Sequence, residues 1–366
     1  MKRSCLVSLA LSAALAFPCV ASAVSAESTA VARAASARGV AWLAAHQAAD
    51  GSFSNPAFPA LTGLPLWALS LAGDTNQAAR AEAAVKFILG CAQEDGGIYR
   101  PDPRRGGAGL GNYNTSVCMM ALQATGRKDV VPAILKARTY TASTQLQGDD
   151  DHAGGFGYDK GGRRHTDLSN TSMALDAMRM TQGVEEMRPA GEKRADLNWD
   201  AALKYVSNMQ EKDGGFLYVK SAPAGAGGRG DAGDAARPRL RSYGSITYDG
   251  LLSLIHCQLT RSDPRVVSAL DYCTRHWTLD ENPGQGGQGL YFYYDILSRA
   301  LNAAGVAEIA AVDGRKIAWK DELIKKLASL QKEDGSWVND NNRWWEADPV
   351  LATSYSLIAL CSALGK

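Results

Sequence analysis

Gln210-Glu-Lys-Asp213-Gly214-Gly215-Phe216 is a stretch whose close copies recur along the chain. Each copy ends a helical pattern of apolar residues, and its Asp-Gly pair favours the positive φ angle at which a helix stops. The residue after the small residues is aromatic or aliphatic, so the chain returns there to an apolar layer. We interpret each copy as a turn between two helices. The copies begin at Gln47, Gln93, Gln147, Gln210 and Gln331, and the one at Gln147 is the loosest.

The spacing of the copies indicates a repeat protein. Gln47 and Gln93 are 46 residues apart, and the following intervals are 54, 63 and 121 residues. The last interval leaves room for two units. Periods of this size are typical of helical hairpins that stack so that neighbours complete each other's core. Six such units fit the chain, which predicts an all-α fold.

Each unit is expected to contain one outer and one inner helix. A segment at about 220–241 consists mostly of Gly, Ala, Pro and Arg, and we expect a flexible insertion there because this composition cannot bury a core. We expect outer helices at 28–46, 77–91, 130–145, 199–209, 264–277 and 319–330, and inner helices at 60–72, 112–125, 167–180, 245–259, 289–304 and 346–364.

A threonine recurs near the start of five of the predicted inner helices. Each one precedes a Leu or Met by seven residues, so the five positions share one register. A hydroxyl group at a helix start can cap exposed backbone amides, which predicts a structural role. The residues are Thr62, Thr115, Thr171, Thr247 and Thr353.

The repeats resemble those of the squalene-cyclase and protein-prenyltransferase family. Members of that family carry a Gln…Asp-Gly-[Gly/Ser]-aromatic signature between an outer and an inner helix, and the likeness here runs from about Val31 to Leu364. The resemblance implies that six outer/inner helical hairpins close into an (α/α)6 toroid whose inner helices line a central cavity. The signature is specific for this fold and says little about the chemistry.

The length and the net charge of the chain are consistent with a single closed ring. A closed ring of hairpins is one cooperative unit, so we expect residues 27–366 to form one domain. The formal net charge of the chain is +1, and no basic stripe is present. This argues against nucleic acid or an anionic membrane as a partner.

Residues 1–26 have the pattern of a signal peptide. A basic start is followed by an apolar run from Cys5 to Phe17 and by small residues that fit a cleavage rule after Ala23 or Ala26. The pattern predicts an exported protein, periplasmic or extracellular, without a transmembrane segment in its mature form.

The acid motif of the resembling cyclases is incomplete. In that family an Asp-x-Asp-Asp-Thr sequence opens an inner helix and supplies an acid strong enough to protonate an alkene. The matching stretch here is Asp167-Leu-Ser169-Asn170-Thr171, in which a hydroxyl and an amide replace the two later carboxyl groups. Neither is a sufficient acid. We therefore expect no squalene-type protonation.

The zinc site of the resembling prenyltransferases is also incomplete. That site uses an Asp-x-Cys on one inner helix and a His on a later one. The nearest match, Asp249-Gly-Leu251, lacks the cysteine, and the last inner helix, which opens at Asp348, contains no histidine. We expect no metal and no other cofactor.

The residues that remain at the mouth, where the inner helices begin, are polar and aromatic. Such a set suits a flat, partly apolar or sugar-like ligand. Three carboxylates are candidates for catalysis, because a pair with separated pKa values permits glycoside cleavage. The catalytic candidates are Asp167, Asp249 and Asp348, and the ligand-binding candidates are Tyr113, Asn114, His165, Asn170, Tyr248, Tyr291 and Trp345.

Three functions remain open at this point. The first is an exported repeat protein whose cavity binds a hydrophobic or partly polar small molecule, or a protein, without the family's standard catalysis. The second is an enzyme that acts on an isoprenoid or a carbohydrate through cavity carboxylates. The third is a structural or assembly module of the cell envelope. A wide apolar lumen favours isoprenoid, facing carboxylates favour sugar cleavage, and a filled lumen favours the structural module.

Overall fold

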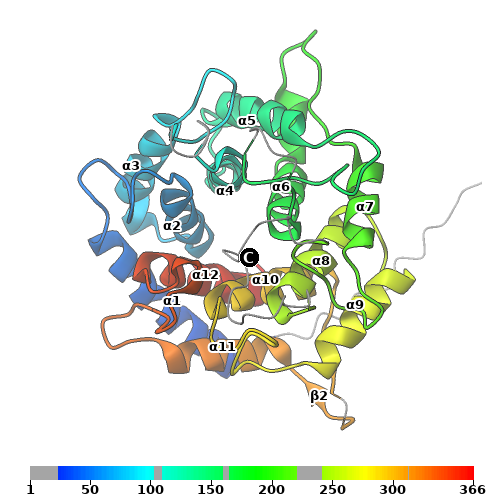
Figure 1. Cartoon of the computed structure of the whole chain (residues 1–366). Coiled ribbons are helices and arrows are strands. Elements are labelled where there is room, and N and C mark those ends of the chain that lie inside the picture. Colours follow the sequence, from blue (N-terminus) through cyan, green and yellow to red (C-terminus); the bar gives the residue numbers. More distant parts are fainter. Residues whose placement is uncertain (1–23, 103–108, 160–164, 221–240, 312) are drawn as a thin grey trace, which may run out of the picture.

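The computed structural model describes residues 24–102, 109–159, 165–220, 241–311 and 313–366. Within these ranges twelve α-helices form an outer and an inner ring, so the predicted toroid is confirmed (Figure 1). The outer helices are α1 (Ala26–Ala45), α3 (Ala78–Leu89), α5 (Val131–Thr144), α7 (Trp199–Asn208), α9 (Pro264–Arg275) and α11 (Trp319–Leu330). The inner helices are α2 (Ala60–Ala72), α4 (Gly111–Ala124), α6 (Leu168–Met180), α8 (Gly244–His256), α10 (Leu290–Ala303) and α12 (Pro349–Ala363).

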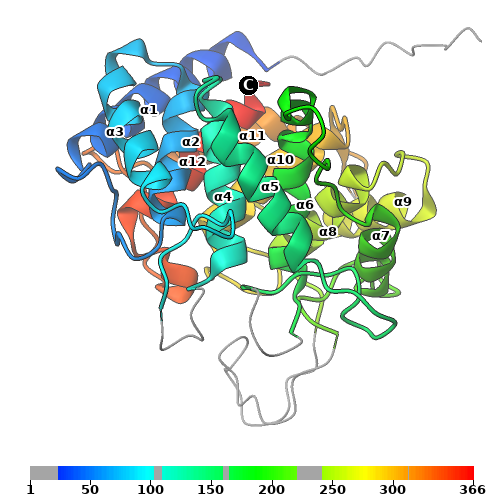
Figure 2. The same ribbon diagram turned by 90° about the horizontal axis from the view of Figure 1, so that it is seen from above.

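The two rings differ in composition because they differ in environment. In α12 every residue from Val350 to Ala363 is buried, as expected for a helix that is surrounded by protein. The outer helix α9 buries only one stripe, which includes Val266 and Ala269, and exposes its other faces. The apolar core therefore lies between the rings, whose helices are seen from above in Figure 2.

The recurring turns join each repeat to the next one. The side-chain amide of Gln210 donates to the carbonyl of Gly214 at 3.1 Å and to the carbonyl of Arg265, at the start of the next outer helix, at 2.9 Å. Gly214 has φ +90°, and a Cβ atom there would lie 2.1 Å from the Ser268 carbonyl oxygen of α9. The Asp-Gly pair thus makes the turn and lets the next helix approach.

The turn after α11 closes the ring. Its Gln331 side chain donates to the carbonyl of Ala35 in α1 at 2.9 Å, and the Trp42 indole N–H of α1 donates to Asp334 Oδ2 at 3.0 Å. On the inside, α12 packs between α10 and α2. The last repeat therefore contacts the first one through the same kind of turn as those at Gln47 and Gln210, whereas Gln93 donates within its own turn, to the carbonyls of Cys91 and Tyr99.

The five threonines have a structural role, but their bonding partner differs from the one predicted. Each hydroxyl accepts a hydrogen bond from the backbone N–H of the last residue of the turn, at 2.8 to 3.2 Å, instead of capping its own helix. The turn and the inner helix are thereby fixed to each other. The pairs are Phe53–Thr62, Ile98–Thr115, Phe156–Thr171, Phe216–Thr247 and Trp337–Thr353.

The prediction for the third turn was wrong by two residues. Gln145, rather than Gln147, donates to the carbonyls of Gly154 and Asn198, at 3.1 and 3.0 Å. This turn is longer than the others, so the glutamine that spans it sits at the end of α5 itself. Gln147 donates instead to the Gln145 carbonyl at 3.2 Å.

Several short elements lie in the connections between the helices of the ring. They include the 3-10 helices η1 (Thr75–Gln77), η3 (Gln182–Met187) and η4 (Arg343–Trp345), and the two-residue strands β1 (Ile309–Ala310) and β2 (Lys316–Ile317), which pair antiparallel. None of the helices in the described ranges is both long and apolar enough to span a bilayer. Most of the predicted signal peptide and nearly all of the predicted insertion at 220–241 lie outside the described residues.

Candidate functional site

Contacts between inner helices that are not neighbours in the ring locate its lumen. Arg299 on α10 donates to the carboxylate of Asp176 on α6, although α8 stands between these two helices. Tyr113 on α4 and Tyr355 on α12 bring their hydroxyl oxygens to 3.4 Å, past the position of α2. Side chains that reach beyond a neighbouring helix in this way lie in the lumen.

A layer of charged side chains crosses the lumen. The Arg299 guanidinium also donates to Asp295 Oδ2 at 2.9 Å and lies 5.3 Å from the ring centroid of Trp67 on α2. His256 Nε2 on α8 lies 3.0 Å from Asp176 Oδ1. We call Asp176, His256, Asp295 and Arg299 the charged layer. The charged layer connects the inner helices α6, α8 and α10 and contacts α2 through Trp67.

The pKa values of the two carboxyl groups of the charged layer are shifted in opposite directions. Burial opposes the ionisation of Asp176, but the charge of Arg299 and the hydrogen bond to His256 keep its pKa below the usual value. At Asp295, burial outweighs the charge of Arg299, and the pKa is raised. Asp176 and Arg299 are therefore the firm ion pair of the layer.

Asp249 on α8 lies within electrostatic reach of Arg299 in the charged layer and of Tyr113 on α4, two places away in the ring, so we assign it to the same lumen. Its exposed fraction is 1%, and Oδ2 has no hydrogen-bond partner among the described residues. Burial raises the pKa of this carboxyl well above its usual range, against the charge of Arg299, and the charge of Asp167 adds to the rise. The raised pKa favours the protonated form of this group, and its Oδ2 is free of partners among the described residues.

Asp167 forms a second buried acidic site at the N-cap of α6. Its Oδ1 accepts from the backbone N–H of Asn170 and its Oδ2 from the Asn170 side chain, both at 2.8 Å. Burial raises the pKa of Asp167 to about 6, against these hydrogen bonds and the charge of His165. The hydroxyl groups of Tyr158 and Tyr218 lie 3.1 Å apart, and Tyr218 also hydrogen-bonds Asp167. The structure thus brings Asp167, Asn170 and His165 together, within electrostatic reach of Asp249.

Asp348 and Asn114 cap inner helices. Asp348 Oδ1 accepts from the Val350 N–H at 2.9 Å, and Oδ2 accepts from the Ser54 hydroxyl. Asn114 Oδ1 accepts from the Ala60 N–H at the start of α2 at 3.0 Å. Both side chains satisfy backbone amides that a helix start leaves without partners, so each has a structural role at the mouth.

The predicted aromatic residues occupy three different places. Tyr113 lies in the lumen. Tyr248 is buried against Tyr293, with ring centroids 5.8 Å apart, and its pKa responds to the thiol of Cys273 on the outer helix α9, so it lies between the rings. Tyr291 donates to a carbonyl of the last turn at 3.3 Å. Trp345 is exposed near the start of α12.

The charged layer was not among the predicted site residues. Its signal is an acidic side chain in the middle of a largely buried inner helix, as with Asp176 in Leu168–Met180 and Asp295 in Leu290–Ala303. Burying a charge is costly unless it is paired, so such a residue is a candidate for a site or an ion pair. The repeat alignment concentrated on helix starts and passed over these central positions.

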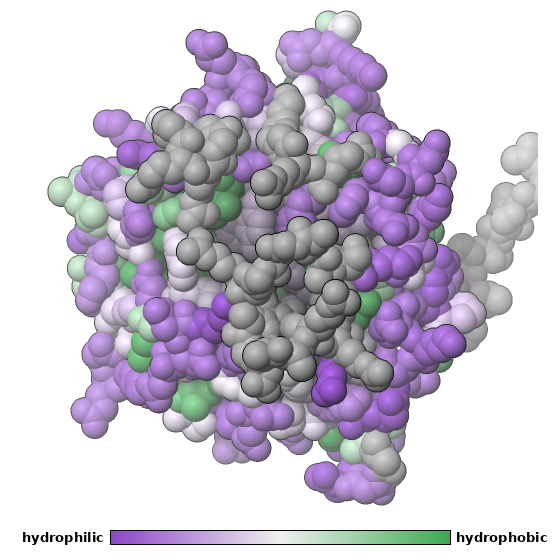
Figure 3. All heavy atoms as spheres, in the orientation of Figure 1, coloured by the Kyte–Doolittle hydropathy of each residue, from purple (hydrophilic) through white to green (hydrophobic). Residues whose placement is uncertain are grey.

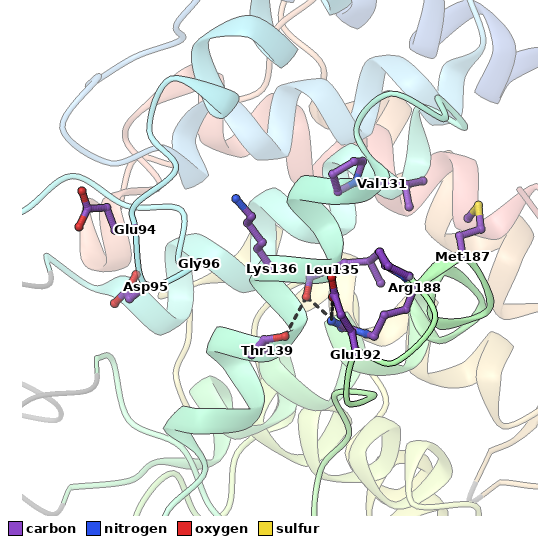
Figure 4. Close-up of a pocket in the computed structure, with 12 residues that line it drawn as sticks. Glu94, Asp95, Gly96, Val131, Leu135, Lys136, Thr139, Met187, Arg188 and Glu192 are labelled. Carbon is purple, nitrogen blue, oxygen red and sulfur yellow. Dashed lines mark hydrogen bonds and ion pairs between the residues drawn. The ribbon is translucent and has the colours of Figure 1, made fainter.

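A groove on the outer wall is separate from the lumen. It has a volume of about 400 Å³ and lies between α5, the turn after α3 and the segment that follows η3 (Figure 4). Its Arg188 is already held by Glu185, at 2.6 Å, and by the Leu135 carbonyl, at 3.1 Å. None of the predicted site residues lines this groove. The described part of the chain contains no group of three or more His, Cys, Asp or Glu side chains placed to hold a metal ion.

Comparison with known proteins points to one family and one fold. Residues 58–275 match the family model described as the prenyltransferase alpha-alpha toroid domain. No curated protein sequence matches the chain.

Solved structures with the same fold include two kinds of enzyme. The type II terpene cyclase MstE from Scytonema has a TM-score of 0.54 at 11% identity, covering 92% of this chain and 99% of its own; a variant of it was solved with the substrate geranylgeranyl dihydroxybenzoate. A glycosidase has a TM-score of 0.53 at 14% identity, covering 93% of this chain and 99% of its own, and a variant of it was solved with glucose. A protein from Actinoplanes has a TM-score of 0.51 at 13% identity, covering 91% and 99%. Identities this low show the fold alone.

Proposed function

Because the chain belongs to the family of prenyltransferase alpha-alpha toroid domains, we propose that its lumen binds a small molecule of sugar-like chemistry to which Asp249 donates a proton. The observation that carries the proposal is the buried Asp249 carboxyl group, whose Oδ2 has no partner among the described residues. A buried polar atom left without a partner costs about 1–3 kcal/mol. A ligand oxygen bound at this atom removes that cost.

The lining of the lumen supports a ligand that is polar on its edges and apolar on its faces. Tyr113 and Tyr355 present hydroxyl groups, and the Phe292 ring lies 5.7 Å from that of Tyr355. Aromatic rings with a few convergent polar groups suit a sugar ring. A long isoprenoid chain needs a continuous apolar chamber, and the ion pair of Arg299 and Asp176 crosses this one. The lining is therefore closer to what a glycosidase needs than to what a prenyl substrate needs.

Glycoside cleavage uses one acid and one base. Burial raises the pKa of Asp249 well above its usual range, whereas Asp167, with a pKa of about 6, is mostly ionised at neutral pH. We therefore assign the acid role to Asp249 and the base role to Asp167. In the proposed step Asp249 gives its proton to the glycosidic oxygen as the bond from that oxygen to the anomeric carbon breaks. Water adds its hydroxide to that carbon, and its remaining proton passes to Asp167. Ser169, in the place of the resembling family's second acid, lies next to Asp249 and lowers its pKa.

Ligand binding and turnover test this proposal together. Thermal-shift measurements with soluble malto-, cello-, xylo- and chito-oligosaccharides, and with geranylgeraniol as the isoprenoid probe, identify the ligand class. Release of reducing ends measures cleavage. We expect Asp249→Asn to lower cleavage by about 10²–10⁴-fold, the range for loss of a general acid. The matched control is Asp271→Asn on the exposed face of α9, which should cleave like the wild type.

Each outcome of this experiment bears on the proposal. Cleavage by the wild type that Asp249→Asn abolishes supports it. Saccharide binding without cleavage supports the ligand class and overturns the proton transfer. A shift with geranylgeraniol alone, or no shift with any probe, overturns the ligand class.

Export is part of the proposed function, because the leader pattern predicts it. The Ser25 hydroxyl caps the first turn of α1, and its N–H donates to Asp321 of α11 at 3.1 Å. Cleavage after Ala23 preserves this contact, whereas cleavage after Ala26 removes it. We expect mass spectrometry of the protein secreted from a bacterial host to find cleavage after Ala23; an intact leader contradicts export.

A further inference from the structure

Two adjacent tryptophans are exposed in η4, just before the last inner helix. Trp344 is 39% exposed and Trp345 is 44% exposed, although both side chains are large and apolar. Their φ angles are +56° and +67°, in the left-handed region. This backbone costs roughly 1–2 kcal/mol for each residue other than glycine. Strain of this kind persists only where the surrounding structure enforces it, and it clusters at ligand sites.

The residue after the pair enforces its conformation. Glu346 is fully buried, and its carboxylate accepts from the backbone N–H groups of Tyr291 and Phe292, the second and third residues of α10, at 3.2 and 2.7 Å, and from the Asn339 side chain at 2.7 Å. These hydrogen bonds fix the backbone on the C-terminal side of the tryptophans. The pair is therefore held outward by a buried anchor, and the exposure is not the result of a loose loop.

Each ring is supported by a neighbour. The Trp344 ring lies directly on Gly289, where a Cβ atom would come within 2.6 Å of the ring, and the Arg343 guanidinium lies 5.4 Å from its centroid. The Trp345 ring meets Phe58, just before α2, edge to face at 4.9 Å. The rings are thus positioned by three segments that lead into α2, α10 and α12. This places them at the mouth of the lumen.

The surroundings of the rings are polar. Asp340, Asn341 and Asn342 immediately precede η4 and are exposed. In Figure 3 the coloured part of this face, outside the grey atoms, is mainly hydrophilic, with only small separate hydrophobic patches. Such a surface does not fit insertion into a bilayer, which needs a continuous apolar face. Half-exposed aromatic rings next to amide and carboxylate groups fit a pyranose ring, which has an apolar C–H face and hydroxyl groups on its edge.

We propose that Trp344 and Trp345 form an aromatic platform that binds one sugar ring of a glycan outside the lumen. The proposal rests on the proposed function, because a glycan with one end in the lumen passes over the mouth. It extends that function from a single sugar to an oligosaccharide: Asp249 acts on one unit while the platform binds a more distant one.

The test compares ligands of different length in the full-length mature protein. Affinities for hexaoses of the four saccharide classes and for the corresponding monosaccharides are measured by calorimetry. We expect Trp345→Ala to weaken hexaose binding about tenfold, which corresponds to about 1.4 kcal/mol, and to leave monosaccharide binding unchanged. Trp277→Phe, on the outer wall where its indole N–H donates to Glu322, is the control and should bind like the wild type.

A second variant separates binding from folding. Asparagine tolerates the left-handed region, so Trp345→Asn is expected to keep the unfolding midpoint within a few degrees of that of the wild type and still to lose hexaose affinity. Equal hexaose affinity in wild type and variant overturns the platform, and so does a loss of affinity seen only in variants that have unfolded. Binding to phosphatidylcholine vesicles that requires Trp345, with no binding to any hexaose, also overturns it. Asp249→Asn distinguishes a failure of the platform from a failure of the proposed function. This variant should lose cleavage and retain hexaose binding at the platform.

Discussion

Replacing Asp167 by Asn should remove a specific part of the pH dependence of folding. In the folded chain this carboxyl is fully buried and its pKa is about 6, whereas its unperturbed value is 3.8. Between about pH 3.8 and 6 the carboxyl group is therefore protonated in the folded state and ionised in the unfolded state. Stability from this group is complete below about pH 3.8 and is lost as the pH rises through 6.

The magnitude follows from the two pKa values. At about 1.36 kcal/mol for each pH unit, a rise from 3.8 to about 6 corresponds to a loss on the order of 3 kcal/mol of unfolding free energy. Asn cannot titrate, so this loss is absent in the variant. The variant keeps an oxygen to accept from the Asn170 N–H but loses an acceptor for the Asn170 side chain, which costs roughly 1 kcal/mol at every pH.

Urea unfolding followed by circular dichroism at several pH values from 3 to 8 measures the effect. The difference in unfolding free energy, wild type minus Asp167→Asn, should fall by roughly 3 kcal/mol between about pH 4 and 6 and be level on either side. Asp271→Asn removes the same charge from an exposed position and corrects for net charge. A difference that is level across this window, or that rises with pH, refutes the assignment of a raised pKa to Asp167.

Three further changes test the ring and the charged layer by thermal and urea unfolding. Thr353→Val leaves the buried Trp337 N–H without its acceptor and should cost about 1–3 kcal/mol; an effect no larger than that of an exposed Thr→Val change would contradict the role of the turn. Gly335→Ala should be clearly more destabilising than Gly73→Ala, because both glycines are left-handed but only at Gly335 does the new Cβ meet a backbone oxygen of α1, at 2.8 Å. Arg299→Met should destabilise by about 3–5 kcal/mol, since it leaves two buried carboxyl groups without their cation; a neutral result would show that the charged layer does not hold the inner helices.

The fold could be predicted from the sequence because its determinants are local. The turn residues Asp213 and Gly214 act within a few residues of each other, and five of the six inner helices keep a threonine in one register. Details of the turns were predicted less accurately, because they depend on the length of each turn and on which residues it brings together. In the third repeat a longer turn moves the bridging role to Gln145, and the partner of each threonine is a turn residue rather than its own helix.

The site was harder to predict because it depends on contacts across the ring. The inner helices are buried on nearly all sides, so their apolar pattern does not reveal which face points to the centre. Arg299 meets Asp176 only because the ring closes, and their separation of 123 positions in the chain gives no hint of the contact. Candidates chosen at helix starts included the true lumen residue Asp249 together with Asp348 and Asn114, which cap helices.

In a ring of repeats, equivalent positions on neighbouring inner helices have nearly the same surroundings. A difference between the residues at two such positions therefore helps to identify a functional residue. Asp249 is the sixth residue after the N-cap of α8, and Asp295 is the sixth residue after the N-cap of α10. Both are buried, and stability alone accounts for Asp295 because Arg299 on its own helix pairs with it. No such partner meets Asp249 Oδ2 among the described residues. Arg299 thus provides a partner for Asp295, whereas Asp249 Oδ2 has none among the described residues, and we propose that this atom serves a ligand rather than the ring.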